Sequence, residues 1–441
     1  MRNIAIGVLG LGNVGTGTLQ LLRDNRDAIE TRLGARLDVR AVLVRDTAKP
    51  RAVELGGARL TTSADDILGD PEIEIVVELI GGTGPARDFV LRALRAGKHV
   101  VTANKALLAE HGEQIFAEAS LRELAVFFEG AVAGGIPILR SVREGLASDR
   151  IEAITGIVNG TSNYILDAMT RTGATYEQAL REAQRAGFAE ADPTLDVDGT
   201  DAAHKLALLA LVSFGVRVDP GAIHKEGITS IDPFDIRTAD ELGYVIKSLA
   251  IARRSERGVS LRVHPTMVPK THVLAGVHGS YNACLVESRA LGRSLYYGRG
   301  AGPMPTGVAV VSDIIEVARL LTRRQSQEQD QGPRGAVSPE APPRVDPLPL
   351  DALECENYLC IHVPNIPGVL GRCAACLGRH GVSIKRMFQD APSGEAAVPM
   401  VIFTEPVAER RVAAALAEMS TFDILKQPTD RIRILDPDTI D

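Results

Sequence analysis

The sequence GLGNVG near the N-terminus fits the G-x-G-x-x-G spacing of a turn that binds a dinucleotide. It follows a strand-like apolar run and opens a helical one, which is the context that the motif requires. Gly10 would permit the tight turn, Gly12 would let the backbone approach a pyrophosphate, and Gly15 would let helix and strand pack closely. Asn13 and Val14 belong to the same turn, and the helix N-terminus there faces negative charge. The motif predicts dinucleotide binding; a glycine-rich turn without a ligand is the alternative.

The residue that ends the second strand should select the nicotinamide cofactor. Arg45 and Asp46 stand side by side at this place. An arginine favours the 2′-phosphate of NADP, whereas an aspartate favours the ribose hydroxyls of NAD. We expect Arg45 and NADP, with NAD as the alternative. Lys105 follows the expected strand His99–Thr102, so it would face the ligand crevice at the carboxyl end of a parallel sheet, unless it is a surface lysine.

The densest group of polar side chains in the chain reads GFAEADPTLDVDGTDAAHK and ends at Lys205. Thr200 can cap a helix that begins at Asp201. Asp201 and Lys205 then lie one turn apart on the same helix face, so a lysine and several carboxylates are expected at the mouth of a packed helix. Two other interpretations stay open: an acidic capping loop with a helical salt bridge, and a divalent metal site, although the spacing departs from the calcium-loop pattern.

Strand and helix patterns alternate over residues 1–130. Ile4–Leu9 and Ile73–Leu79 are short apolar runs, as expected for strands buried on both faces, and Thr16–Leu33 has helical spacing. This alternation of strands and helices predicts an α/β domain with a doubly wound, parallel sheet of the Rossmann type. Residues 131–322 mix strand-like pieces with long helical stretches, which is typical of an α+β domain.

A stretch rich in glutamine, proline and charge covers residues 323–350 and is expected to be a flexible linker. The following residues, 351–430, show a β-α-β-β-α-β order of ferredoxin-like type, with Ile424–Lys426 as the expected last strand. Cys373 and Cys376 form C-x-x-C within a predicted helix, without the surroundings of a redox pair or a zinc site, and we interpret both as small core residues.

Composition narrows the possible functions. The chain has 441 residues, 45% hydrophobic and 24% charged, which is ordinary for a globular protein. Its net charge of −7 argues against nucleic-acid binding. No apolar run approaches the roughly 18 residues of a membrane span, and no signal peptide is recognisable. Five scattered cysteines are too few for a disulfide framework. We therefore expect a cytoplasmic protein without a membrane partner.

The run GFAEADPTLDVDGTDAAHKLALL strongly resembles a characteristic segment of the homoserine dehydrogenase family, and IVNGTSNYIL resembles a second one. The resemblance covers the whole chain. Residues 1–130 resemble the family's NAD(P)-binding domain, 131–322 its catalytic and dimerisation domain, and 351–430 an ACT domain, the regulatory module of many bacterial members. Because the chain begins at the first Rossmann strand, we expect a monofunctional enzyme.

The resemblance implies NAD(P)H-dependent interconversion of L-aspartate 4-semialdehyde and L-homoserine, on the route to threonine, methionine and isoleucine. Lys205 matches the catalytic lysine, whose ammonium group can stabilise charge on the carbonyl oxygen and deliver a proton. Asp201 and Lys105 match further catalytic residues, and Lys105 matches a lysine that also lies near the cofactor. Asp201 and Glu190 match residues that hold the substrate. The other matching positions are Asp196, Gly160 and Thr161 around the substrate and Gly187 and Gly302 around the cofactor. Phe188 departs from the tyrosine of many members, so a contact made by that hydroxyl is absent.

The segment EGAVAGGIP resembles the family's monovalent-cation loop. The matching ligands are the side chain of Glu129 and the backbone carbonyls of Val132, Gly134 and Ile136. A glycine-rich turn between two domains is the alternative, and the residues do not distinguish Na⁺ from K⁺.

The segment NIPGVL resembles the ligand loop of ACT domains, where the helix N-terminus can take an amino acid's carboxylate. The matching effector residues are Asn365, Ile366, Gly368, Val369 and Leu370. The resemblance implies feedback control by threonine and a homodimer or homotetramer; a dimerisation module without a ligand is the alternative.

Two rival functions remain: another amino-acid-pathway oxidoreductase on the same scaffold, and a non-catalytic metabolite sensor. The segment 187–205 argues against the first. The joint presence of Lys205, Asp201, Glu190 and Lys105 argues against the second.

Overall fold

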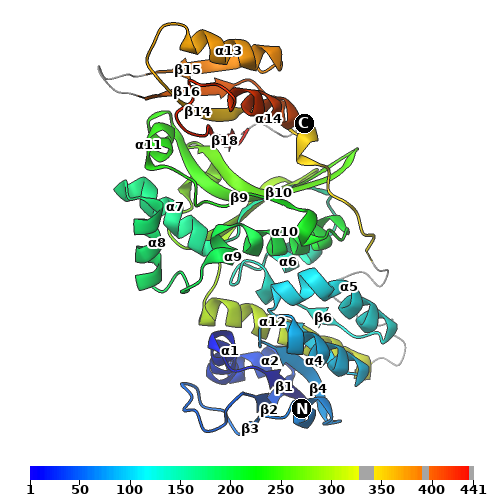
Figure 1. Cartoon of the computed structure of the whole chain (residues 1–441). Helices are drawn as coiled ribbons and strands as arrows, with labels where there is room; N and C mark the ends of the chain where they lie inside the picture. The colour runs from blue at the N-terminus through cyan, green and yellow to red at the C-terminus, as the bar shows by residue number, and fades with distance from the viewer. Residues whose placement is uncertain (327–341, 390–396, 437–441) are drawn as a thin grey trace.

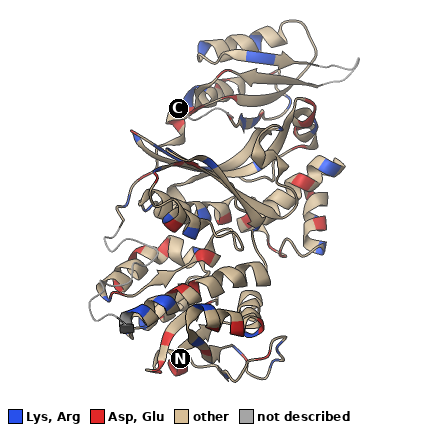
Figure 2. Cartoon of the chain, turned by 180° about the vertical axis from the view of Figure 1, so that it is seen from behind, with Lys and Arg blue, Asp and Glu red and all other residues tan. Residues whose placement is uncertain are grey.

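The computed structural model describes residues 1–326, 342–389 and 397–436. Three parts lie one above another in Figure 1: an N-terminal domain at the bottom, a middle part, and a smaller C-terminal part at the top. Within the described residues, no helix is both long and apolar enough to cross a membrane. Lys and Arg are interspersed with Asp and Glu along the chain (Figure 2).

The N-terminal domain contains a six-stranded sheet in the order β3-β2-β1-β4-β5-β6, with every pair parallel. Its strands are β1 (Arg2–Leu9), β2 (Ala35–Leu43), β3 (Arg59–Thr61), β4 (Ile73–Glu78), β5 (His99–Thr102) and β6 (Val126–Phe127). Its helices are α1 (Asn13–Asp24), α2 (Arg26–Leu33), α3 (Asp65–Leu68), α4 (Gly84–Arg95) and α5 (Lys105–Leu121). The strand order reverses between β1 and β4, where open α/β sheets form their ligand crevice. The expected doubly wound sheet is confirmed.

The middle part supplies the strand order β12-β11-β7-β9-β10, with antiparallel pairs, and β8 pairs with β10. Its strands are β7 (Ile151–Ile157), β8 (His224–Lys225), β9 (Tyr244–Ser255), β10 (Gly258–Pro269), β11 (Tyr281–Ser288) and β12 (Gly292–Arg299). Its helices are α6 (Ile138–Arg140), α7 (Gly160–Thr172), α8 (Tyr176–Arg185), α9 (Thr194–Val197), α10 (Thr200–Phe214), α11 (Pro233–Glu241) and α12 (Pro303–Ser326). In Figure 1, α9 and α10 lie between this sheet and the N-terminal domain.

The C-terminal part has the predicted β-α-β-β-α-β order and the antiparallel strand order β18-β14-β16-β15. Its main elements are β14 (Asn357–Val363), α13 (Val369–Arg379), β15 (Ile384–Phe388), β16 (Val398–Thr404), α14 (Glu409–Met419) and β18 (Asp430–Ile434), with a short pair formed by β13 (Glu354–Cys355) and β17 (Val407–Ala408). β18 also pairs in parallel with β10, where Thr266 aligns with Arg433. One ten-stranded sheet therefore runs through both parts.

Two predicted elements are wrong in detail. The single helix expected over Thr16–Leu33 is two helices, because Asn25 leaves the helical conformation with φ −111° and ψ 17°. The last strand is Asp430–Ile434 rather than Ile424–Lys426. The sequence of β18 alternates charged and apolar residues, so it resembles an exposed tail. Its charged residue Arg433 is nevertheless only 4% exposed.

The expected linker lies partly outside the described residues, and its described ends are attached to folded structure. Its first residues continue α12 to Ser326. Its last residues run along the middle part, where the Leu348 N–H donates to the Val259 carbonyl at 2.7 Å. α12 itself returns to the N-terminal domain and packs against α1, where a Cβ on Gly17 would lie 2.1 Å from the Pro303 carbonyl oxygen.

The C-terminal sheet buries both faces. Leu359 and Ile361 of β14 face α13 and α14, in a cluster that also contains the fully buried Cys373 and Cys376. The interpretation of these two cysteines as core residues is confirmed. Tyr358, on the opposite face of β14, packs in a cluster with α7 and α11 of the middle part. The two parts therefore share a core in addition to a sheet.

Candidate active site

The polar cluster predicted around Asp201 forms at the first turn of α10. The helix begins at Thr200 after Gly199, which has φ +87° and no side chain, so the expected cap by Thr200 is wrong. Asp201 Oδ2 accepts a hydrogen bond from Lys205 Nζ at 2.6 Å, one turn along the helix. Lys205 Nζ also donates to the Val158 carbonyl at 2.6 Å. A carboxylate and a carbonyl therefore fix the position of this ammonium group.

Lys105 brings a second ammonium group to the same carboxylate. It begins α5 just after β5, and its Nζ lies 3.0 Å from Asp201 Oδ1. The charge of Asp201 raises the pKa of Lys105, against the lowering effect of burial. Asp201 is only 7% exposed. Burial pushes the pKa of Asp201 upward, but Lys205 and Lys105 outweigh this effect and hold the pKa below its usual range.

Asn159 ties the cluster to the acidic loop. Its side-chain amide donates to Asp201 Oδ2 at 2.8 Å and to Asp196 Oδ1 at 2.7 Å. Its side-chain oxygen accepts from the Ser162 N–H at 2.8 Å, which caps α7. Sequence reasoning missed Asn159 as a site residue. The available signal was its position directly before a helix, within a polar NGT segment, because an asparagine there is a favoured cap.

The remaining predicted substrate residues lie along the same two segments. The Thr161 hydroxyl donates to the Phe188 carbonyl at 2.7 Å, which joins α7 to the acidic loop. Gly160 leaves no room for a side chain, since a Cβ there would lie 2.8 Å from the Ser280 carbonyl oxygen. Glu190 is exposed on the loop, and its charge contributes to the raised pKa of Lys105.

A cavity of about 550 Å³ opens at the glycine-rich turn and is lined by Gly10, Gly12 and Arg45. Gly10 has φ +105°, and a Cβ there would lie 2.7 Å from the Leu79 carbonyl oxygen, so only glycine fits. Around Gly12, by contrast, nothing lies within 4 Å of a Cβ position. A ligand can therefore approach the backbone at this point, as the motif predicts. Arg45 shares the wall with Asp46, and two further cations, Lys49 and Arg51, line the same cavity.

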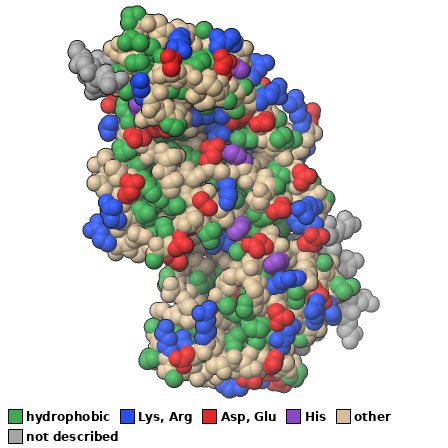
Figure 3. Space-filling model, viewed as in Figure 1, with side chains coloured by type: hydrophobic (Ala, Val, Ile, Leu, Met, Phe, Trp, Pro, Cys, Tyr) green, Lys and Arg blue, Asp and Glu red, His purple; other side chains and the backbone are tan. Residues whose placement is uncertain are grey.

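Six other predicted cofactor residues lie outside the wall of this cavity, and one of them, Lys105, lies at Asp201 as described above. Asn13, Val14 and Gly15 form the first turn of α1, next to it. Gly302 directly precedes α12, on the segment that returns to the N-terminal domain. Gly187 is exposed and follows α8, beside the acidic loop. The surface is hollowed where the N-terminal domain meets the middle part (Figure 3).

The predicted cation loop surrounds a buried acid. Glu129 is 4% exposed, and its two carboxylate oxygens accept from the backbone N–H groups of Leu139 and Arg140 at 2.9 and 2.8 Å. Asp313, which is 1% exposed, accepts from the Glu129 N–H at 2.8 Å. Burial raises the pKa of Glu129, and burial together with the Glu129 charge raises the pKa of Asp313 to about 8.

The backbone carbonyls of this loop differ in whether they already accept a backbone hydrogen bond. The Ile136 carbonyl accepts from the Ile138 N–H at 2.8 Å. The Val132 and Gly134 carbonyls take part in no backbone hydrogen bond between described residues. Two of the three carbonyls matched to the cation loop are thus without a backbone donor.

The predicted effector loop precedes α13. Gly368 is the N-cap of this helix and has φ +91°. Ile366 and Leu370 on either side are 56% and 38% exposed. Of the other residues expected to bind an effector, Asn365 lies in the turn and Val369 is buried at the start of the helix. The loop is therefore partly exposed, and no side chain of a described residue caps the helix that follows it.

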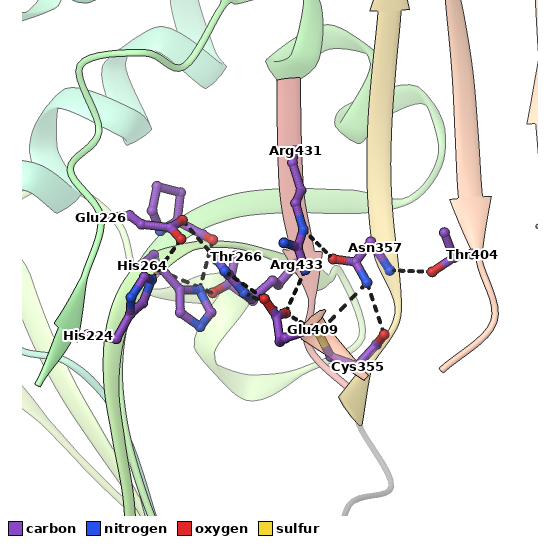
Figure 4. A network of polar contacts seen from close by, with 11 residues as sticks. His224, Glu226, His264, Thr266, Cys355, Asn357, Thr404, Glu409, Arg431 and Arg433 are labelled. Atoms are coloured by element: carbon purple, nitrogen blue, oxygen red, sulfur yellow. Dashed lines mark hydrogen bonds and ion pairs between the residues drawn. The ribbon is translucent and has the colours of Figure 1, made fainter. Parts of the chain in front are cut away.

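A buried charge network joins the C-terminal part to the middle part (Figure 4). Arg433 of β18 donates from Nε and Nη2 to the two carboxylate oxygens of Glu409, at 2.9 and 3.0 Å. Its Nη1 donates to Glu226 Oε2 at 2.8 Å. Glu226 also accepts from His224 at 2.8 Å, and its N–H donates to the Val263 carbonyl of β10 at 2.8 Å. Sequence reasoning found none of these residues.

The neighbours of Glu226 contact the acidic loop. Lys225 Nζ donates to the Thr200 hydroxyl at the start of α10. The Ile228 N–H donates to the Val197 carbonyl at 2.9 Å. A Cβ on Gly227 would lie 2.6 Å from the same carbonyl oxygen. The segment 225–228 therefore supports the loop that carries Asp196 and leads into Asp201.

Comparisons with known proteins agree along the chain. Residues 137–315 match the family model of homoserine dehydrogenase, and residues 10–129 match that of the homoserine dehydrogenase NAD binding domain. A homoserine dehydrogenase of Pseudomonas aeruginosa is 42% identical over 435 residues, which cover 98% of this chain and 99% of the relative. The structure of a homoserine dehydrogenase from Thiobacillus denitrificans superposes with a TM-score of 0.92 at 45% identity and covers 99% of both chains. A hyperthermophilic archaeal homoserine dehydrogenase, solved in complex with NADPH, covers 72% of this chain and 98% of its own at 25% identity, with a TM-score of 0.60.

A dinucleotide-binding domain beside a carboxylate held between two lysines defines an NAD(P)-dependent oxidoreductase. Within that class, the chain belongs to the homoserine dehydrogenase family. Its reaction is the NAD(P)-dependent interconversion of L-homoserine and L-aspartate 4-semialdehyde, a step of amino-acid biosynthesis. The family resemblance noted in the sequence is confirmed.

Proposed function

We propose that Lys205 transfers the proton in this reaction, and that Asp201 and Lys105 complete the catalytic group. The observation that carries the proposal is a buried carboxylate shared by two ammonium groups, with Lys205 Nζ at 2.6 Å and Lys105 Nζ at 3.0 Å. An ammonium group has three donors. Lys205 uses two of them on Asp201 and Val158, which leaves the third for a substrate oxygen.

During reduction, negative charge develops on the aldehyde oxygen, and NADPH or NADH supplies the hydride when bound. Lys205 stabilises this charge and gives the oxygen its proton, which leaves a neutral amine; in the oxidative direction this neutral amine takes the proton from the alcohol. Lys105, held in its charged form by Asp201, adds positive potential to the same pocket. Glu190 and Asp196 offer carboxylates to the substrate's ammonium group, and Gly160 and Thr161 shape the pocket.

The test is Lys205→Ala, assayed by homoserine-dependent reduction of NADP⁺ and NAD⁺. We expect turnover to fall by about 10²–10⁴, the usual contribution of general acid–base catalysis. Cofactor affinity, measured separately by fluorescence titration, should be retained. Lys270→Ala removes an exposed lysine whose partner among the described residues is Asp240, so it is the matched control. Unchanged turnover in Lys205→Ala would refute the assignment.

The cofactor that we propose is NADP, with NAD as the alternative. Arg45, Lys49 and Arg51 line one wall of the cavity at the glycine-rich turn, where positive charge suits a 2′-phosphate. The neighbouring Asp46 is the feature that would favour NAD. The backbone around Gly12 would hold the pyrophosphate, with the helix N-terminus of α1 behind it. Asn13, Val14, Gly15, Gly187 and Gly302 remain expected contacts.

We also propose that the Glu129 loop binds Na⁺ or K⁺. Glu129 and Asp313 place two acids next to each other in a buried site, where Arg140 Nη2 lies 3.5 Å from Asp313 and backbone N–H groups donate to both carboxylates. The Val132 and Gly134 carbonyls are without backbone donors. A hard monovalent cation between these oxygens, with Ile136 as a further ligand, would balance the charge.

For the C-terminal part, we propose an ACT domain that binds an amino acid, threonine by resemblance. Its β-α-β-β-α-β order supports the assignment. The exposed turn before α13, from Asn365 to Leu370, supports the place of binding. The pair Arg433–Glu226 connects this part with the acidic loop. Suppression of turnover by threonine would support the proposal, and turnover that is indifferent to threonine would contradict it.

We propose a homodimer or homotetramer in the cytoplasm. β12 is an edge strand of the ten-stranded sheet, and Leu295 and Tyr297 on it are 43% and 53% exposed. An exposed apolar edge strand is a surface on which a second copy can pair. All five cysteines are free thiols, as a reducing compartment keeps them. Light scattering of the purified enzyme tests the assembly.

A further inference from the structure

A cysteine, a histidine and an aspartate lie together where the C-terminal sheet meets α11. Cys360 and His362 are two residues apart on β14, so their side chains point to the same face of the sheet. Asp430 of β18 is the cross-strand partner of Cys360, and cross-strand partners also share a face. One potential ligand atom from each of the three residues lies within 4.8 Å of the other two. The pairing of the two strands therefore holds three metal-binding side chains together.

The spacing of these atoms suits a small ion. Cys360 Sγ lies 3.9 Å from His362 Nδ1. Around a tetrahedral zinc ion, with Zn–S and Zn–N bonds of about 2.3 and 2.0 Å, a sulfur and a nitrogen ligand are about 3.5 Å apart. A movement of a few tenths of an ångström closes this difference. His362 Nδ1 also contacts Gln427 Nε2 at 2.5 Å, and because Gln427 is exposed, its side chain can turn away from the ring.

The surroundings of the three side chains are acidic. Asp235 of α11 is 1% exposed; Tyr358 donates to its Oδ1 at 2.7 Å, and its Oδ2 has no hydrogen-bond partner among the described residues. Burial, together with Asp430 and Asp232, raises the pKa of Asp235 to about 7. His362 is the basic side chain that acts on Asp430, and no described lysine or arginine forms an ion pair with any of these three acids. A bound cation would lower an electrostatic cost that these side chains do not offset by themselves.

A second trio of similar composition lies between α13 and α14 but is already neutralised. Cys376, His380 and Glu418 also place ligand atoms within 4.8 Å of one another. Glu418, however, forms an ion pair with Arg379, and its other oxygen lies 2.7 Å from His380 Nε2. The Cys376 thiol donates to the Ala415 carbonyl at 3.6 Å. Because an arginine supplies the positive charge here, this trio is the matched control for the first one.

We propose that Cys360, His362 and Asp430 bind a Zn²⁺ ion, with a water molecule as the fourth ligand. Thiolate and imidazole ligands suit zinc, whereas magnesium and calcium prefer oxygen ligands alone. Burial and the nearby Asp235 raise the pKa of the Cys360 thiol to about 12, so the thiol keeps its proton in the absence of metal. When the ion enters, this proton passes to water and the sulfur binds as a thiolate. The ion then ties β14 to β18 beside α11.

The experiment is an absorbance titration of the full chain with Co²⁺, after treatment with a chelator that is then removed by dialysis. Co²⁺ bound by a thiolate gives a sulfur-to-metal charge-transfer band, so the spectrum reports the ligand without an activity assay. We expect one Co²⁺ per chain to produce this band, Zn²⁺ to abolish it by competition, and Mg²⁺ at the same concentration to leave it unchanged. The band should be lost in Cys360→Ser and retained in Cys376→Ser.

A second pair of variants leaves the buried cysteine in place. Asp430→Asn keeps the size of the side chain and removes its charge, so Zn²⁺ affinity, measured by competition with a chromogenic chelator, should fall about tenfold or more. Asp423→Asn changes an exposed acid of the same part, which pairs with Arg372, and should bind as the wild type does. Without metal, Asp430→Asn should melt at the same or a higher temperature than the wild type. Zn²⁺ should raise the melting temperature of Asp423→Asn by more than that of Asp430→Asn.

Four results would overturn the proposal. The first is a folded wild type that gives no charge-transfer band with Co²⁺. The second is a band that is lost in Cys376→Ser and retained in Cys360→Ser, which would move the site to α13 and α14. The third is displacement of Co²⁺ by an equal concentration of Mg²⁺, which would indicate a general acidic surface. The fourth is equal stabilisation of Asp430→Asn and Asp423→Asn by Zn²⁺, and this comparison decides the matter if Cys360→Ser does not fold.

Discussion

Asp201→Asn is the substitution that most directly tests how the catalytic group is organised. The shape of the side chain is retained, but its charge is removed from between two ammonium groups. The carboxylate accepts three hydrogen bonds, from Lys205 at 2.6 Å, from Asn159 at 2.8 Å and from Lys105 at 3.0 Å. In the better of its two orientations, the new amide keeps its oxygen toward Lys205 and Asn159. It then points an NH₂ group at Lys105, where donor meets donor.

The expected loss follows from these contacts. A hydrogen bond to a charged group contributes roughly 1.5–3 kcal/mol, and a neutral one about 0.5–1.5 kcal/mol. In Asp201→Asn the contact with Lys105 disappears, the contact with Asn159 becomes neutral, and the contact with Lys205 keeps only the charge of its donor, which together sums to roughly 3–6 kcal/mol. If this energy orients the lysines in the transition state, kcat/KM falls by about 10²–10⁴. Because Asp201 is the main cause of the raised pKa of Lys105, the alkaline limit of the pH profile should also move to lower pH.

The assay is homoserine-dependent NADP⁺ reduction over a range of pH, with melting curves to verify folding. Asp198→Asn is the matched control. It lies on the same loop, its side chain is 40% exposed, and its hydrogen bonds go to Thr200. We expect the control to retain kcat/KM within a fewfold of the wild type. A folded Asp201→Asn enzyme with kcat/KM within tenfold of the control, and with the same alkaline limit, would refute the organising role of this carboxylate.

Three further predictions concern the cofactor and the cation. Gly10→Ala should destabilise the fold by about 1–3 kcal/mol, because the new side chain combines a strained φ with a backbone clash. Gly12→Val should instead leave the melting temperature unchanged and raise KM for NADP⁺. Equal stability of the two variants would contradict this contrast. Arg45→Ala should raise KM for NADP⁺ about tenfold with little effect on NAD⁺, and equal changes for both cofactors would exclude a 2′-phosphate contact. Burial and Glu129 raise the pKa of Asp313 to about 8, above its unfolded value, so without a bound cation stability falls as pH rises toward 8. A cation favours the ionised form, so NaCl or KCl should raise the melting temperature relative to choline chloride, more near pH 8 than well below it, and Asp313→Asn should abolish the difference.

The sequence predicted the elements whose periodicity is simple. The strands of the N-terminal domain are short apolar runs because both faces are covered, and Ile4–Leu9 and His99–Thr102 appear nearly as expected. Elements fixed by long-range charge pairing were missed. β18 reads as an exposed tail, since nothing local indicates that Arg433 will be neutralised by Glu409 and Glu226.

The candidate site also contains some contacts that the sequence predicts and others that depend on how the domains pack. The contact between Asp201 and Lys205 follows from helix geometry, because residues four apart share a face. The contact between Lys105 and Asp201 requires α5 of one domain to meet α10 of another, and spacing along the chain carries no information about it. Asn159 is a third kind of residue. Its local role as a helix cap was readable, but its bonds to Asp196 and Asp201 depend on how α7 and α10 pack.

The C-terminal part is therefore structurally connected to the segments that carry the candidate active site. Arg433 is buried between Glu409 of its own part and Glu226 of the middle part. Removing Glu409, the buried partner that accepts two of its hydrogen bonds, would leave this charge poorly compensated, which is strongly unfavourable. β18 is moreover fixed to β10 by strand pairing. A movement of β18 relative to β10 must either break the pair with Glu226 or carry the segment 225–228 along. That segment touches Val197 and Thr200. Whatever an effector does to the C-terminal sheet, the shortest physical connection to Asp201 runs through Arg433 and Glu226.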